Sequence, residues 1–147
     1  PGPGPDVSCG NLKKSTPGKI TCFLIKQYLL TSIILLSLDF IYISLFKNYF
    51  NHQVQLVQGT PLQLNIVPTI CCYILLSLGI YYFVINKNLS YLDSFYLGIF
   101  VYGIYDLTTM ALFKNWKLTT VVMDTLWGGI LFVLVKFLLQ KIKFYIV

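Results

Sequence analysis

Residues 119–139 read TTVVMDTLWGGILFVLVKFLL, an almost unbroken apolar stretch that is long enough to cross a membrane as a helix. A transmembrane helix needs about 20 predominantly apolar residues. Similar stretches occur at residues 27–46, 64–85 and 92–112. Because backbone polar groups in lipid must be hydrogen-bonded within their own segment, each stretch predicts a helix. The predicted fold class is all-α: a polytopic membrane protein with a four-helix transmembrane bundle and no strands.

The composition of the 147-residue chain supports this class, since 56% of its residues are hydrophobic and 11% are charged. Soluble domains are about 45–50% apolar and about 25% charged. A soluble enzyme, a disordered tail and a disulfide-stapled secreted domain are therefore excluded. The net charge of +6 comes from lysines that flank the apolar stretches rather than forming one patch. We therefore expect the lipid bilayer, and no nucleic acid, as a partner.

The domain organisation follows from the same stretches. Residues 1–26 form a polar tail with Pro, Gly and Lys, residues 27–139 the four-span membrane domain, and residues 140–147 a short basic tail. The polar connection 47–63 is expected to be a loop, because it contains the turn signal Gly-Thr-Pro at residues 59–61. The amino-terminal tail of the chain, residues 1–26, is expected to contact other proteins.

The lysines predict the orientation of the chain in the membrane. One side would carry Lys13, Lys14, Lys19, Lys26, Lys87, Lys136, Lys141 and Lys143, and the other side Lys47, Lys114 and Lys117. Because cytoplasmic segments carry the excess of basic residues, both termini are expected in the cytoplasm, or on the equivalent face of an internal viral membrane.

Three aspartates inside the apolar stretches call for an explanation: Asp39, Asp106 and Asp124. An Asp at the centre of a transmembrane helix costs roughly 2.5–3.5 kcal/mol on insertion scales. At a rise of 1.5 Å per residue, all three lie roughly 8–10 Å below the non-cytoplasmic boundary. We therefore predict a layer of carboxylates at one depth. Asp106 and Asp124 should face each other across a helical hairpin, where both should not ionise.

Residues at helical spacing complete a predicted polar cluster, because hydroxyl and indole groups donate hydrogen bonds to carboxylates. The cluster consists of Asp39, Tyr42, Tyr102, Asp106, Thr109, Thr120, Asp124 and Trp127. Gly128 is expected to allow close helix approach. In the following loop, Lys114, Trp116 and Lys117 are predicted interface anchors. Two interpretations remain open: a structural clasp between helices, or a site for a proton, a cation or a polar headgroup.

Catalytic chemistry has little support in the residue inventory. The chain has no Glu, no Arg and a single His, His52. Multi-histidine iron centres and His/Cys/carboxylate zinc sites need more ligands than that. A Mg²⁺ site made from Asp oxygens is the remaining catalytic design. We therefore name no catalytic residue and expect no cofactor and no metal, and an enzymatic role is not favoured.

Three segments resemble a known family: SLDFIYISLF at 37–46, YGIYDLTTMALFKNW at 102–116 and MDTLWGG at 123–129. Their order and spacing are similar to those of a family of small four-span membrane proteins known only as a domain of unknown function. It occurs in bacteria, some eukaryotes and large DNA viruses. The resemblance covers roughly residues 27–139, and it departs at Thr109, where the family usually has Asn. It implies the topology and no established activity. The family pattern includes Asp39, Asp106, Asp124, Trp116 and Trp127.

Two functions from different classes are compatible with these observations. The first is a structural or anchoring component of a membrane-associated assembly, such as the internal membrane and capsid layer of a large DNA virus. The alternative is a small transporter or lipid-modifying protein that uses the intramembrane Asp cluster. A cavity converging on the three carboxylates would favour the second function, and dry packing around them would favour the first.

Overall fold

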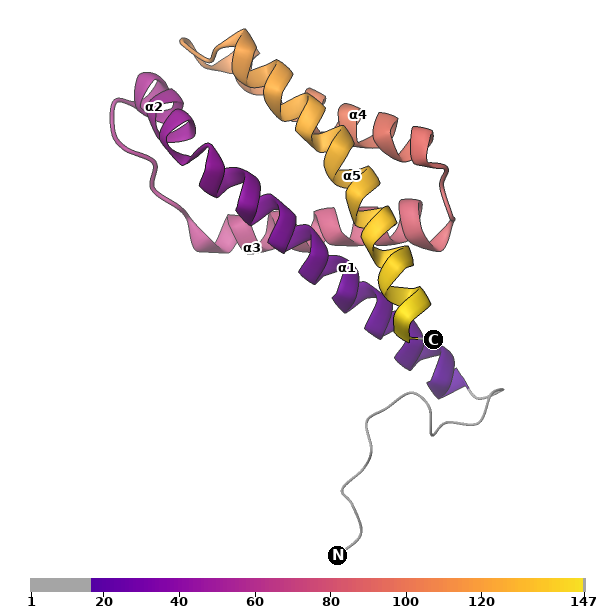
Figure 1. The fold of residues 1–147 in the computed structure, drawn as a ribbon. Helices are drawn as coiled ribbons and strands as arrows, with labels where there is room; N and C mark the ends of the chain where they lie inside the picture. The colour runs from indigo at the N-terminus through magenta and orange to yellow at the C-terminus, as the bar shows by residue number, and fades with distance from the viewer. Residues whose placement is uncertain (1–16, 147) are drawn as a thin grey trace, which may run out of the picture.

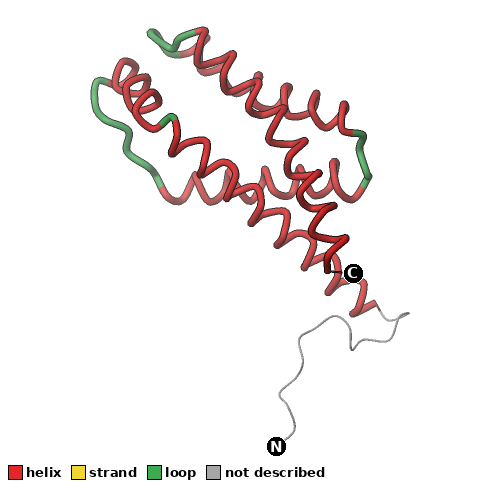
Figure 2. The backbone as a smooth tube through the Cα atoms, viewed as in Figure 1, coloured by secondary structure: helices red, strands yellow, loops and turns green. Residues whose placement is uncertain are grey.

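The computed structural model describes residues 17–146, and these residues form helices joined by short connections (Figure 1). The elements are α1 (Pro17–Leu45), α2 (Lys47–Gln58), α3 (Ile66–Gly79), its π-helical continuation η2 (Ile80–Asn86), α4 (Tyr91–Leu112) and α5 (Leu118–Ile146). Figure 2 shows no strand within this described part of the chain, which confirms the all-α fold class.

Within the part of the chain that the structure describes, four helices are long and apolar enough to cross a membrane: Ile20–Leu45, Ile66–Asn86, Tyr91–Leu112 and Leu118–Lys143. The first helix begins at Pro17, inside the predicted tail of residues 1–26, because Pro is tolerated in the first turn of a helix. The last helix runs on to Ile146, through most of the predicted basic tail. Residues 1–16 of the amino-terminal tail, and the contacts expected of them, lie outside the described residues.

The expectation of a loop throughout residues 47–63 was wrong, because α2 occupies its first twelve residues. The partly buried Tyr49, Phe50, Val54 and Val57 recur at helical spacing and give α2 one apolar face. Gly59 ends the helix in the left-handed region at φ 78°, and its N–H donates to the Gln55 carbonyl at 2.9 Å. Amphipathic helices of this kind lie along a membrane interface.

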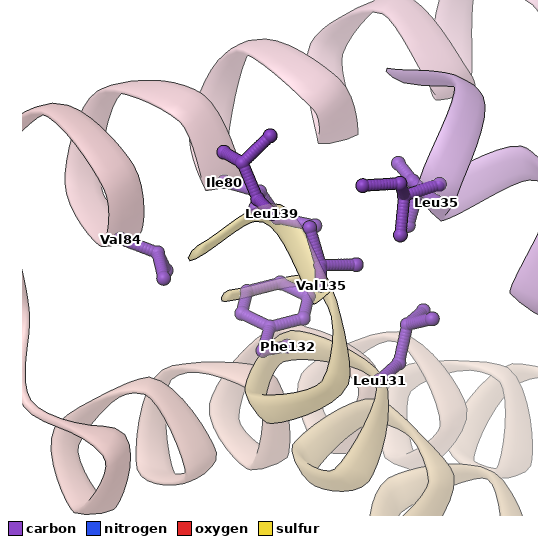
Figure 3. Close-up of a cluster of buried hydrophobic side chains, with 8 residues drawn as sticks. Leu35, Ile80, Val84, Leu131, Phe132, Val135 and Leu139 are labelled. Carbon is purple, nitrogen blue, oxygen red and sulfur yellow. The ribbon is translucent and has the colours of Figure 1, made fainter. Parts of the chain in front are cut away.

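The apolar core joins the first, second and fourth spans. It contains Leu35 of α1, Ile80 and Val84 of η2, and Leu131, Phe132, Val135 and Leu139 of α5 (Figure 3). Many large apolar side chains on the outside stay exposed, for example Phe40 at 72%. An exposed apolar exterior is costly in water and suits contact with lipid.

The α4–α5 hairpin packs so closely that Gly98 and Gly128 leave no room for a side chain. A Cβ atom at Gly98 would lie 2.2 Å from the Gly128 carbonyl oxygen and 2.8 Å from the Gly129 Cα. A Cβ atom at Gly128 would lie 2.4 Å from the Tyr102 ring. Small residues allow such approach between membrane helices, so Gly128 has the place expected from the sequence.

The two ends of the bundle carry different elements. The start of α1 and the end of α5 lie at one end, and α2 and the α4–α5 loop lie at the other (Figure 1). Asp39, Asp106 and Asp124 each lie six residues from the α2 end of their spans, at Leu45, Leu112 and Leu118. At 1.5 Å per residue this places all three about 9 Å below that end.

Candidate functional site

Asp39 connects three helices through its carboxylate. It lies on α1 and is 7% exposed. The Tyr73 hydroxyl of α3 donates to its Oδ2, and the Trp127 indole N–H of α5 donates to its Oδ1 at 3.1 Å. Each carboxylate oxygen of Asp39 therefore accepts a hydrogen bond from a different helix.

Tyr42 links this group to Asp124. It lies one turn after Asp39 on α1, and its hydroxyl donates to Asp124 Oδ1 at 2.7 Å. Its ring stacks on that of Trp127, with centroids 4.6 Å apart and planes 8° apart. Asp39 and Asp124 are therefore joined through a stacked pair of aromatic rings.

Asp106 of α4 is fully buried at 0% exposure, and neither of its oxygens has a hydrogen-bond partner in the described part of the chain. Its carboxylate lies near that of Asp124. Two carboxylates both accept, so they bond only when they share a proton. The unpaired indole N–H of Trp116 lies near Asp106 without completing a hydrogen bond.

These residues form a continuous row from α3 to α4, which we call the polar layer. Its members are Asp39, Tyr42, Tyr73, Asp106, Asp124 and Trp127. Three cross-helix hydrogen bonds therefore tie α1 to α3 and α5.

Three residues of the predicted polar cluster lie outside this layer. The Thr109 hydroxyl donates to the Tyr105 carbonyl of its own helix, at 2.8 Å. Thr120 is buried and bonds to α2. Tyr102 packs its ring against Gly128 and lines a cavity. Helical spacing identifies the face of a residue, and it does not identify the partner of its hydroxyl.

Helix α2 covers the end of the polar layer through a network centred on Gln53. The buried Gln53 side chain donates to the Asn115 carbonyl at 2.8 Å and accepts from the Thr120 hydroxyl at 2.7 Å. It also accepts from the Lys117 backbone N–H at 3.2 Å. Tyr49 and Thr120 share a hydroxyl–hydroxyl bond of 2.8 Å.

The predicted interface anchors belong to the α4–α5 loop, to which Gln53 is hydrogen-bonded. The side chains of Lys114 and Lys117 are exposed, and Trp116 is half-buried. Their role as anchors stays a prediction.

A cavity of about 560 Å³ opens between α1, α3 and α4 beside one end of the polar layer. Among the described residues, Asp39 is the only charged one in its lining. Apolar or aromatic residues, including Tyr73, Tyr102 and Tyr105, provide most of the rest. We call it the Asp39 cavity. A cleft of about 850 Å³ shares Ile43, Thr69 and Tyr73 with it and reaches Lys47. Asp106 and Asp124 line neither. The convergence of three carboxylates on one cavity, named above as the sign of a transporter or lipid-modifying protein, is therefore not observed, and Asp39 alone borders this cavity.

Among the residues that the structure describes, no three or more His, Cys, Asp or Glu side chains form a group that could hold a metal ion.

Tyr73, Tyr49 and Gln53 contribute to the site or its cover and were missed from the sequence. Tyr73 lies seven residues into its span, close to the depth of Asp39, and depth counting would have found it. Tyr49 and Gln53 were missed because their segment was expected to be a loop.

The fold and the buried polar layer define an integral, multi-pass membrane protein. The chain belongs to the family described as "Predicted membrane protein (DUF2177)", whose model matches residues 24–138. This match confirms the resemblance seen in the sequence. No curated protein and no solved structure matches the chain. The function of the family is unknown, so any activity is a matter of proposal.

Proposed function

We propose that this membrane protein binds a lipophilic cation in the Asp39 cavity, as a small transporter or a lipid-modifying protein would. The observation that carries the proposal is the buried carboxylate of Asp39, the only charged group among the described residues that line a mostly apolar and aromatic cavity. Its volume of about 560 Å³ is in the range of small-molecule sites.

Charge supports a cation rather than a neutral or anionic ligand. The partners of Asp39, Tyr73 and Trp127, are hydrogen-bond donors without a formal positive charge. A buried charge is costly unless an opposite charge compensates it. The rings of Tyr102 and Tyr105 also line the cavity, and aromatic faces attract ammonium groups. The apolar lining suits an attached hydrocarbon chain.

The test uses the full chain in nanodiscs of neutral lipid, with Trp116→Phe so that Trp127 is the remaining tryptophan. Decyltrimethylammonium is titrated and Trp127 fluorescence is recorded, with decanol as the uncharged control. Asp39→Asn should weaken cation binding at least about tenfold, the equivalent of 1.4 kcal/mol. Asp93→Asn, an exposed change at the start of α4, should leave binding unchanged.

Val101→Phe tests the same cavity without changing a hydrogen bond of Asp39, because Val101 lines the wall on α4. It should also weaken binding, and it serves if Asp39→Asn does not fold. Equal affinity in Asp39→Asn and Asp93→Asn, or an equal response to decanol, would overturn the proposal.

A second candidate function is the structural or anchoring role in a membrane-associated assembly. The specific observation in its favour is that the hydrogen bonds to Asp39 and Asp124 come from other helices, as a clasp requires. In this role the chain would sit in an internal viral membrane or a cellular one, both termini on the cytoplasmic side or its equivalent. Its amino-terminal tail would meet other proteins, and nucleic acid would not be a partner. An Asp39→Asn protein that fails to fold, combined with full binding in Val101→Phe, favours this role.

A further inference from the structure

A second, smaller polar cavity lies at the opposite end of the bundle from α2. Its volume is about 200 Å³, and its polar lining consists of Asn88, Lys136, Gln140 and Lys143. These residues come from the η2–α4 loop and from α5. The lining contains two ammonium groups and two amides, and none of the described residues adds a carboxylate to it.

Lys136 is the unusual member of this lining, because it is 4% exposed within a membrane-spanning helix. Its ammonium donates to the Leu89 carbonyl and lies 3.5 Å from the Asn88 side-chain oxygen. It also lies 4.8 Å from the centroid of the Tyr91 ring. These described partners are all uncharged. A buried ammonium is normally paired with an anion, because its desolvation is costly.

Lys143 places a second positive charge on the same cavity. It lies seven residues after Lys136, two helical turns along one face of α5. Its side chain is half-buried and near the end of the span, where headgroups of the surrounding leaflet lie. Basic pockets between membrane helices at this level are suited to phosphate-containing headgroups.

We infer that this cavity binds the phosphate group of an anionic phospholipid from the surrounding leaflet. The two ammonium groups compensate the charge of the phosphate, and the amides of Asn88 and Gln140 supply neutral donors. The remaining lining is apolar, namely Val84, Ile85 and Leu139, and suits the start of the acyl chains. The inference does not depend on the function proposed for the Asp39 cavity.

The experiment measures lipid retention on the full chain by native mass spectrometry after exchange into phosphatidylglycerol or phosphatidylcholine. Phosphatidylglycerol should be retained more strongly, with one tight site. Lys143→Gln should weaken that site about tenfold, as expected for the loss of one hydrogen bond to a charged group. Lys141→Gln is the matched control, because Lys141 is exposed and lies over the Phe137 ring outside the cavity.

Lys136→Gln should reduce lipid retention more than Lys143→Gln does. If Lys136→Gln does not fold, the comparison of Lys143→Gln with Lys141→Gln alone tests the inference. Equal retention by Lys143→Gln and Lys141→Gln, or equal retention of the two lipids, would overturn the inference. A parallel measurement of thermal stability during titration with inorganic phosphate distinguishes free phosphate from the phosphate of a lipid headgroup. Thermal protection by phosphate alone, with none added by phosphatidylglycerol, would also overturn the lipid assignment.

Discussion

Asp39 and Asp106 lie at the same depth in the membrane-spanning bundle and have opposite surroundings. Asp39 receives two hydrogen bonds and borders a cavity, whereas Asp106 is fully buried and receives none in the described residues. Their common depth could be predicted from the sequence by counting residues at 1.5 Å each. Their surroundings could not, because they depend on the side-chain directions of Tyr73 and Trp116.

The Asp106–Asp124 pair should share one proton, because the two carboxylates lie close together in a buried site and neither oxygen of Asp106 accepts a hydrogen bond within the described residues. We expect the infrared C=O stretch of a protonated carboxyl, and its loss in Asp106→Asn. The Asn amide keeps a donor for Asp124, so circular dichroism should show an unchanged helix content. Asp39→Asn should retain the band, since Asp39 is paired with other groups. A band that persists in Asp106→Asn would contradict proton sharing by this pair.

At the scale of elements, α2 shows where the sequence reading failed. Its polar composition and the turn at residues 59–61 hid a helical face of Tyr49, Phe50, Val54 and Val57. A short amphipathic helix lacks the long apolar stretch by which the spans were identified. The spans themselves could be predicted because membrane insertion imposes a minimum apolar length.

Gln53 should hold α2 onto the α4–α5 loop. Gln53→Leu removes three hydrogen bonds, to Asn115, Thr120 and the Lys117 backbone, and should free α2 from the loop. The free energy of unfolding should fall by about 1–3 kcal/mol, because buried partners are left unpaired. Hydrogen–deuterium exchange should accelerate across α2. Gln55→Leu, the same substitution at an exposed position of α2, is the control. Equal protection from hydrogen–deuterium exchange in the two variants would show that Gln53 does not hold α2.

Gly98 should set the distance between α4 and α5. Gly98→Ala places a Cβ atom 2.2 Å from the backbone oxygen of Gly128, so the helices must separate. Overpacking of this kind costs about 1–3 kcal/mol, and the melting temperature in detergent should fall. Gly79→Ala is the control, because nothing lies within 4 Å of a Cβ atom there. It should be neutral or stabilising by up to about 1 kcal/mol. Equal melting temperatures for the two variants would argue against close packing at Gly98.

At the scale of the whole molecule, the four spans and their order could be predicted from the sequence. Which spans touch could be predicted only in part. The short connection between α4 and α5 indicated that they pair. Residue counting could place Tyr73 of α3 at the depth of Asp39, but it could not indicate that the two side chains would meet. Contacts between distant spans depend on how the helices rotate about their axes, and every span here is apolar on most of its circumference.

The topology makes a prediction for the whole chain, because the start of α2 and the end of α5 lie at opposite ends of the bundle (Figure 1). Single cysteines replace the exposed Lys47 or Lys141 in a chain whose four native cysteines are changed to serine. In sealed vesicles of known orientation, a membrane-impermeant maleimide should label the two positions from opposite sides. The lysine distribution further predicts that position 141 reacts from the cytoplasmic side.

A third position, Lys114, provides an internal control for this labelling experiment. Lys114 is exposed in the α4–α5 loop, at the α2 end of the bundle, so Lys114→Cys should react from the same side as Lys47→Cys. If positions 47 and 141 react from the same side, the four-span topology is wrong. If all three react as expected but position 141 faces away from the cytoplasm, the topology stands and the lysine-based orientation is wrong. The two parts of the prediction are thereby tested separately, because the span count fixes relative sidedness and the lysines alone fix its direction.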